Sequence, residues 1–158
     1  MALRKIVEQG DTSYRVRSNA IEAYADASDG LADLAGLWDS LLATDSYRET
    51  VRTAALRAIG DHCDDGLFEK LIAWSGLDKP PECRIAAIKA IGAAMSEENL
   101  AANDLSERSV DRGLKMLGDW LASRSRRIRG AALYALADMG SVARPLLPKI
   151  DRLASGDN

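Results

Sequence analysis

The chain has 158 residues, of which 47% are hydrophobic and 28% charged, and its formal net charge is −3. This length and composition are typical of one ordinary globular domain that is long enough to bury a core. The acidic balance argues against a nucleic-acid partner or an anionic membrane surface, and the sequence holds neither an apolar run long enough to span a membrane nor a secretory signal pattern.

The apolar composition favours helices. Aromatic residues make up 5% of the chain, and the apolar residues are mostly Leu, Ala and Ile, which suit close packing between helices better than β-sheets. The two cysteines, Cys63 and Cys83, do not form an even framework of short spacings. We therefore expect reduced thiols and a cytoplasmic protein.

In chain order, the first predicted element is a short helix end that contains Leu3, Ile6 and Val7. Apolar stripes at 31–42, 67–74 and 110–121 predict three further helices, and the tail from Ser141 to Leu153 predicts a last one. Pro145 is tolerated there as an early helical residue. Asp64 or Asp65 is positioned to cap the helix at 67–74.

Between these stripes, one pattern recurs four times without gaps. The segments are VRSNAIEAYA from Val16, VRTAALRAIG from Val51, CRIAAIKAIG from Cys83 and IRGAALYALA from Ile128, with starts 35, 32 and 45 residues apart. Each segment reads apolar-Arg-x-x-Ala-apolar-x-Ala-apolar-small, which places the apolar residues on one broad helical face. Leu56, Ile88 and Leu133 occupy the same position and are predicted core residues.

The alternation of stripes and repeats predicts a single all-α domain of stacked helix pairs, because one pair alone cannot bury its apolar face. We expect units at about 1–29, 30–63, 64–96 and 106–140, followed by a capping helix at 143–155. The expected architecture is a right-handed α–α superhelix. The shortness of the first helix, which ends by Glu8, indicates a fragment of a longer protein.

These repeats resemble the HEAT family, in which an Asp in the turn inside each unit precedes an Arg early in the second helix. The matching pairs are Asp11 and Arg17, Asp45 and Arg52, and Asp78 and Arg84. Arg129 takes the Arg position of the fourth unit, where Ser123 replaces the Asp. The resemblance implies a structural ladder in which each carboxylate accepts hydrogen bonds from backbone N–H groups and from an Arg of a stacked unit.

The stretch from Asp45 to Gly92 also resembles the HEAT-type C-terminal region of zinc aminopeptidases of the aminopeptidase N type. The cues are the S-Y-R-x-x-V-R opening, an aromatic residue late in the next helix, and a pair of prolines before the following repeat. The resemblance implies a domain that packs on a catalytic domain and narrows the access of peptides to its site.

The second helices of HEAT units line a concave face, and equivalent outward positions on these helices are Glu22, Arg57, Lys89 and Tyr134. One step away lie Ser18, Thr53, Ile85 and Gly130. The stripe is mixed in charge, with Arg57 and Lys89 as its cations, which suits a protein or peptide partner and not a nucleic acid. A solvated face without a ligand fits the same pattern.

No catalytic or cofactor-binding constellation is evident in the sequence. His62 is the only histidine, so the H-E-x-x-H motif of a zinc peptidase is absent, as is a Gly-rich phosphate loop. We interpret His62 as a residue of a helix C-terminal turn and Cys83 as a core residue, whereas Cys63 could be exposed. We therefore predict no enzyme activity, metal or cofactor for this chain.

Three features keep two interpretations each. The Arg run at 124–129 is either a solvated helix start or a contact for an acidic partner. Trp38, Trp74 and Trp120 either pack between units or anchor a partner. The insertion at 96–105 is either a longer connection with an extra helical turn or a functional loop.

The sequence thus favours a non-catalytic interaction or scaffold module whose partner is a protein or peptide, including the rest of its own parent chain. A free-standing adaptor that binds a protein segment is the alternative. An enzyme of the HEAT-like bilin lyase or nucleic-acid glycosylase type fits less well, because it would need a chromophore pocket or a basic surface.

Overall fold

The computed structural model describes residues 2–9, 13–28, 35–102 and 105–155, and every regular element in these ranges is helical. The α-helices are α1 (Ala2–Gln9), α2 (Tyr14–Asp26), α3 (Ala35–Ala43), α4 (Thr50–Asp61), α5 (Asp65–Trp74), α6 (Pro81–Ala94), α7 (Glu97–Ala102), α8 (Glu107–Leu121), α9 (Arg126–Asp138) and α10 (Leu147–Ser155). Short 3₁₀ helices cover Tyr47–Glu49 and Gly140–Leu146. The all-α prediction is confirmed for this part of the chain.

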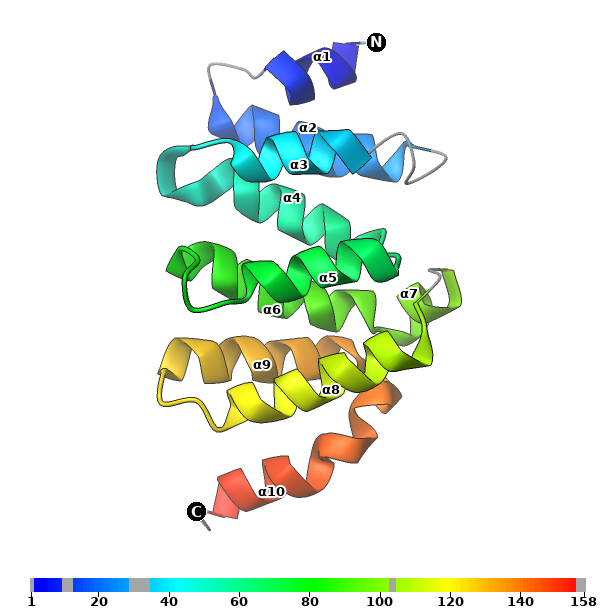
Figure 1. Cartoon of the computed structure of the whole chain (residues 1–158), viewed down its shortest axis with the longest axis vertical. Coiled ribbons are helices and arrows are strands. Elements are labelled where there is room, and N and C mark those ends of the chain that lie inside the picture. The colour runs from blue at the N-terminus through cyan, green and yellow to red at the C-terminus, as the bar shows by residue number, and fades with distance from the viewer. Residues whose placement is uncertain (1, 10–12, 29–34, 103–104, 156–158) are drawn as a thin grey trace.

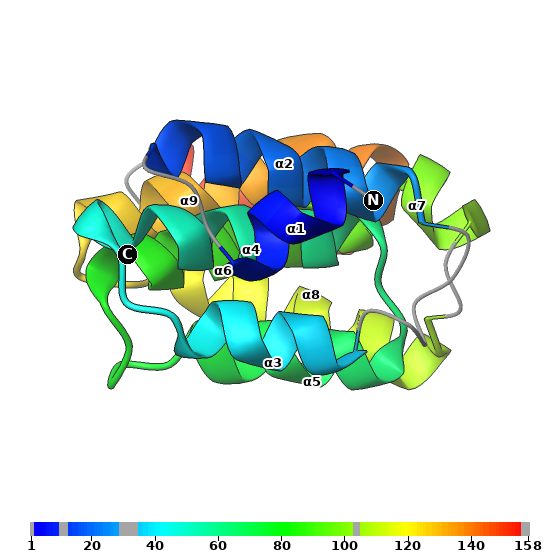
Figure 2. The ribbon, with the colours of Figure 1, turned by 90° about the horizontal axis from the view of Figure 1, so that it is seen from above.

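The helices form two layers (Figure 2). Helices α2, α4, α6 and α9, which carry the four repeated segments, form what we call the repeat layer, and α3, α5 and α8 form the second layer. Within the repeat layer, α4 packs against both α2 and α6, and α6 packs against α9. The elements follow one another along the long axis, with the two chain ends at opposite ends of the molecule (Figure 1). None of the described helices is both long and apolar enough to cross a membrane.

Local capping residues set where several helices begin. The side chains of Ser13, Asp64, Ser106 and Ser125 each accept a hydrogen bond from the backbone N–H three residues later. The Asp64 contact to the N–H of Leu67 is 2.7 Å long, which confirms one of the two predicted caps. Such caps satisfy a backbone donor that the helix itself leaves unpaired.

The glycines that end the second and third repeated segments permit a close approach of neighbouring helices. A Cβ atom added to Gly60 of α4 would lie 2.7 Å from the carbonyl oxygen of Ala90 in α6. Gly92 of α6 faces Ala135 of α9 in the same way. At these two positions the helices of the repeat layer therefore pack backbone against backbone.

Burial of the repeated apolar positions depends on their place in the stack. Leu56 and Ile88 are completely buried, as predicted. The prediction is wrong for Leu133, which is 48% exposed, because the repeat layer ends at α9. At the other end Val16, the first residue of its segment, is 44% exposed, whereas its equivalent Val51 is buried.

The Arg at the second position of each repeated segment forms hydrogen bonds that the predicted ladder did not include. All four arginines donate to backbone carbonyls at or just beyond the C-terminal end of the preceding helix. The contacts are Arg17 to Val7 at 3.0 Å, Arg52 to Leu42 at 2.8 Å, Arg84 to Ser75 at 3.4 Å and Arg129 to Ser123 at 2.8 Å. Each guanidinium therefore caps carbonyls that its neighbouring helix leaves unpaired.

The expected carboxylate partners follow no common pattern. Asp45 contacts Arg52 at 2.5 Å, but the two residues belong to one unit and not to stacked units. Asp78 pairs with Lys79 at 2.9 Å, and the structure shows no direct bond from Asp78 to Arg84 among the described residues. Asp11 lies outside the described residues. What the four repeat arginines share is a bond to a backbone carbonyl of their own unit.

The insertion and the tail are both helical. The insertion at 96–105 contains α7, and the Glu97 carboxylate accepts a hydrogen bond from the Ser141 N–H at 2.8 Å. The capping helix begins later than predicted, since Pro145 lies in the 3₁₀ helix and α10 begins at Leu147. Pro148 lies in the first turn of α10, as expected.

Candidate functional site

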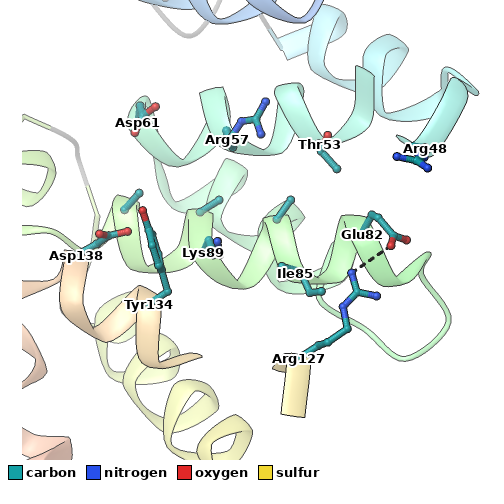
Figure 3. Close-up of a pocket in the computed structure, with 13 residues that line it drawn as sticks. Arg48, Thr53, Arg57, Asp61, Glu82, Ile85, Lys89, Arg127, Tyr134 and Asp138 are labelled. Atoms are coloured by element: carbon teal, nitrogen blue, oxygen red, sulfur yellow. Dashed lines mark hydrogen bonds and ion pairs between the residues drawn. The ribbon is translucent and has the colours of Figure 1, made fainter. Parts of the chain in front are cut away.

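A groove of about 570 Å³ lies on the face of the repeat layer and runs along α6, between α4 and α9 (Figure 3). Ile85, Ala86, Ala90 and Ala93 form its apolar part. Its polar lining is Arg48, Thr53, Arg57, Asp61, Glu82, Lys89, Arg127, Tyr134 and Asp138. A cavity of this size with a few placed charges is typical of ligand sites.

The structure brings the predicted stripe together at this groove. Arg57, Lys89 and Tyr134 line it, and Glu22 lies beside it in contact with Arg57 at 2.9 Å. The Lys89 ammonium sits 4.1 Å from the centre of the Tyr134 ring, which is a cation–π contact. The ion pair joins α2 to α4 and the cation–π contact joins α6 to α9. These side chains are therefore positioned by the stacking of neighbouring helices.

The neighbouring positions are used unequally. Thr53 and Ile85 line the groove. Ser18 is buried, and its hydroxyl donates to the carbonyl of Tyr14 at 2.8 Å. Gly130 is exposed, with open space where a Cβ would be.

Sequence reasoning missed both ends of the groove. Arg48 and Arg127 line one end together with Glu82, and Asp61 and Asp138 lie at the other end (Figure 3). Arg127 contacts Glu82 at 3.2 Å, so this member of the Arg run is a groove residue and not only a solvated helix start. The groove thus has two cations, Arg48 and Arg127, in addition to Arg57 and Lys89 of the predicted stripe.

A signal for most of these residues was present in the repeat itself. Glu82 and Arg127 each precede their segment by one residue, and Asp61 and Asp138 each follow theirs directly. Extending the repeat by one residue on both sides would have found all four. Arg48 has no such signal, because it lies in the 3₁₀ helix before α4.

Arg48 is presented by an unusual backbone. Arg48 and Glu49 have φ angles of 52° and 57°, a left-handed conformation that costs a non-glycine residue about 1–3 kcal/mol. Contacts around the turn support it: Glu49 pairs with Arg52 at 2.6 Å, and the Arg48 guanidinium lies 5.3 Å from the centre of the Tyr47 ring. The turn thus places Arg48 in the groove lining in spite of its strained backbone conformation.

The balance of charge changes along the groove, since Arg48 and Arg127 outnumber Glu82 at one end and Asp61 and Asp138 lie at the other. The cationic end coincides with the N-terminal ends of α4 and α9, and the anionic end coincides with their C-terminal ends (Figure 3). Partial burial raises the pKa of the Asp61 carboxyl above its usual value, and the carboxylates of Asp26 and Glu22 add to this against the opposing effect of His62 and Arg57. A positively charged group beside Asp61 would offset the repulsion between this carboxylate and those of Asp26 and Glu22.

The histidine and the two cysteines, which were considered as candidates for chemistry, are held in contacts within the fold. His62 Nε2 lies 3.1 Å from Asp26 Oδ1 and links the C-terminal ends of α4 and α2. The suggestion that Cys63 is exposed is wrong, since it is fully buried. Burial raises the pKa of the Cys63 thiol and, with the nearby Glu49 carboxylate, raises the pKa of Cys83 to about 12. Both sulfurs are therefore protonated at neutral pH and are poor nucleophiles.

The tryptophans pack into the structure. Trp38 is buried, and Trp74 and Trp120 are partly buried against the core. Within the described ranges, no group of three or more His, Cys, Asp or Glu side chains is arranged to hold a metal ion.

Comparisons of the chain with protein-family models, with curated proteins and with solved structures find no significant match.

Proposed function

We propose that the chain is a HEAT-type α-solenoid that binds a segment of another polypeptide in the groove of the repeat layer and is not itself catalytic. The observation that carries the proposal is the construction of the groove. Equivalent positions of successive repeats supply Arg57, Lys89 and the aromatic ring of Tyr134 to one continuous surface. A surface of this kind grows with each unit and suits an elongated ligand.

The physical properties of the groove support this role. Its side chains project from helices whose core-facing residues are buried, so little backbone conformational entropy is lost when a ligand binds. Arg57 and Tyr134 remain exposed, and arginine and tyrosine are residue types that often dominate the energy of protein interfaces. The apolar floor offers a surface that binding would remove from water.

The proposed partner is either a separate protein or the rest of a longer parent chain, as the resemblance to the C-terminal region of aminopeptidases suggests. Both cases place a polypeptide segment in the same groove. The two buried, unpaired thiols are consistent with a reducing compartment, and we propose the cytoplasm.

Selection from a phage-displayed library of random peptides tests the proposal without assuming a ligand. Selected peptides should bind the double variant Arg57→Glu plus Lys89→Glu at least about tenfold more weakly than the original chain, because two groove cations are reversed. Circular dichroism and the unfolding midpoint establish that the variant is folded.

The matched control carries the same charge change on the second layer, at Lys70→Glu plus Arg112→Glu. These residues pair with Asp39 and Glu69 across neighbouring helices, as Arg57 does with Glu22. The control should retain binding. Failure to select any peptide, or an equal loss in both double variants, would contradict binding in the groove.

A further inference from the structure

We propose that the segment bound in the groove is bipolar: an extended stretch of about five residues with a carboxylate at one end, a cation at the other and small apolar side chains between them. This inference rests on the proposed binding function of the groove. It follows from the arrangement of charge, from the length of the groove and from its apolar floor.

The length comes from α6, whose residues from Glu82 to Ala93 line the groove. At about 1.5 Å per helical residue, this part of α6 is about 16 Å long. An extended chain advances about 3.3 Å per residue, so about five residues span the distance.

Among the described residues, four charges of the groove have no direct ion pair: Arg48 at one end, Asp61 and Asp138 at the other, and Lys89 between them. Two of these contact aromatic rings, since Arg48 lies 5.3 Å from the centre of the Tyr47 ring and Lys89 lies 4.1 Å from that of Tyr134. Arg57 and Arg127 are paired with Glu22 and Glu82. At the two ends of α6, the charges without an ion pair thus have opposite sign, with a cation at one end and carboxylates at the other (Figure 3). A ligand with the complementary order would pair with both ends at once.

The helix dipoles strengthen this field. Helices α2, α4 and α9 carry no acidic residue in the first turn and no basic residue in the last turn, which is the reverse of the arrangement that stabilises a helix. Instead Asp26, Asp61 and Asp138 stand at the ends of these helices. Side-chain charge and helix dipole therefore have the same sign at the C-terminal ends of α2, α4 and α9, which is unfavourable in the free protein. At the other end Glu49 and Glu82 oppose the dipoles of α4 and α6. A ligand cation would thus gain most at the acidic end.

The middle of the groove sets the central residues of the ligand. Ala86 and Ala90 form a shallow floor beside Ile85, and the Lys89 side chain lies over Tyr134. Small or medium apolar side chains fit this surface, whereas a further cation would be repelled by Lys89 and Arg57.

The experiment measures the competition of short synthetic peptides with a library-selected peptide for the full chain at low salt. Acetylated and amidated Asp-Ala-Leu-Ala-Lys and its reverse Lys-Ala-Leu-Ala-Asp are compared with versions that have Asp at both ends or Lys at both ends. At least one bipolar peptide should compete about tenfold better than both like-charged peptides. Equal competition by all four, or no competition by the bipolar pair, would overturn the inference.

Variants of the chain test the two ends separately. Arg48→Glu plus Arg127→Glu should reverse the preference toward the peptide with two Lys, and Asp61→Lys plus Asp138→Lys should reverse it toward the peptide with two Asp. The milder Asp61→Asn plus Asp138→Asn should abolish the preference for a cation if the Lys variant does not fold. An unchanged preference in folded variants would contradict the assignment of the ends.

The same measurements separate this inference from the function on which it rests. Library peptides that depend on Arg57 and Lys89 but lack an acid–base pair about four residues apart would support the binding function and overturn the bipolar ligand. Tighter binding of a single-stranded oligonucleotide than of any peptide, or dimerisation of the chain that bipolar peptides do not reverse, would also overturn it.

Discussion

The middle of the repeat layer and its C-terminal end place the same repeated residue in different surroundings. Ile88 of α6 is completely buried, whereas Leu133, at the equivalent position of α9, is 48% exposed. Helix α6 packs between α4 and α9, whereas the elements described beyond α9 are the 3₁₀ helix Gly140–Leu146 and α10. The comparison teaches that a repeat does not bury its own apolar residue; the next unit does.

The cover over the C-terminal end is incomplete. Leu121, Leu133, Ile150 and Leu153 line a second cavity between the ends of α8, α9 and α10. By contrast, Leu56 and Ile88, which are equivalent to Leu133, are completely buried, and α4 touches α6 directly at Gly60 and Ala90. The two regions should therefore respond differently to the same substitution.

The largest expected difference concerns side-chain truncation. Ile88→Ala should lower the free energy of unfolding by about 2–5 kcal/mol, because it removes a buried side chain and leaves a cavity. Leu133→Ala should cost less than about 1 kcal/mol, since half of that side chain is already in water. Urea unfolding followed by circular dichroism measures both. Equal losses would mean that α10 covers Leu133 in solution as fully as a repeat would.

A smaller effect, with opposite signs in the two regions, is expected for glycine substitutions. Gly60→Ala should destabilise the chain by about 1–2 kcal/mol, because the new methyl group forces α4 away from Ala90 and this exceeds the gain in helix propensity. Gly130→Ala, which meets open space in α9, should stabilise it by about 0.5–1 kcal/mol. Thermal unfolding of both variants shows whether each substitution raises or lowers the midpoint. A lower midpoint for Gly130→Ala would contradict the open space found at this position.

The smallest effect concerns charge at the acidic end of the groove. The pKa of Asp61 is raised in the folded state, so the fold loses stability as pH rises through that pKa and the carboxyl ionises. Asp61→Asn should therefore raise the unfolding midpoint slightly at neutral pH, and the gain should vanish as pH falls below the usual carboxyl pKa of about 3.8.

Asp65 provides a control of the opposite sign. Its carboxylate accepts hydrogen bonds from Ser109 and from the backbone and hydroxyl of Ser106, which lower its pKa. The stability that it contributes is present above its usual pKa and is lost as pH falls through the lowered one. Asp65→Asn should consequently lower the midpoint at neutral pH. The same direction for both variants would contradict the assigned surroundings.

The candidate site was partly predictable. Arg57, Lys89 and Tyr134 were found because equal positions in stacked repeats fall on one face. The ends of the groove were missed because the repeat was truncated one residue too early on each side, and Arg48 was missed because a left-handed turn directs it there. Propensity does not predict that turn, since tertiary contacts around Glu49 and Arg52 support it.

The sequence by itself determined the helices, their order and most of the core, because helical periodicity and N-terminal caps depend on residues within a few positions of each other. Only the tertiary structure decided the exposure of Leu133 and the partners of the four repeat arginines. The partners of the arginines depend on which helix end lies nearby, and the exposure of Leu133 depends on what packs against α9. The local sequence pattern around Arg52 and Arg129 is the same and predicts neither outcome. Burial and hydrogen bonding between units are properties of the stack, and the same residue meets different neighbours in its middle and at its ends.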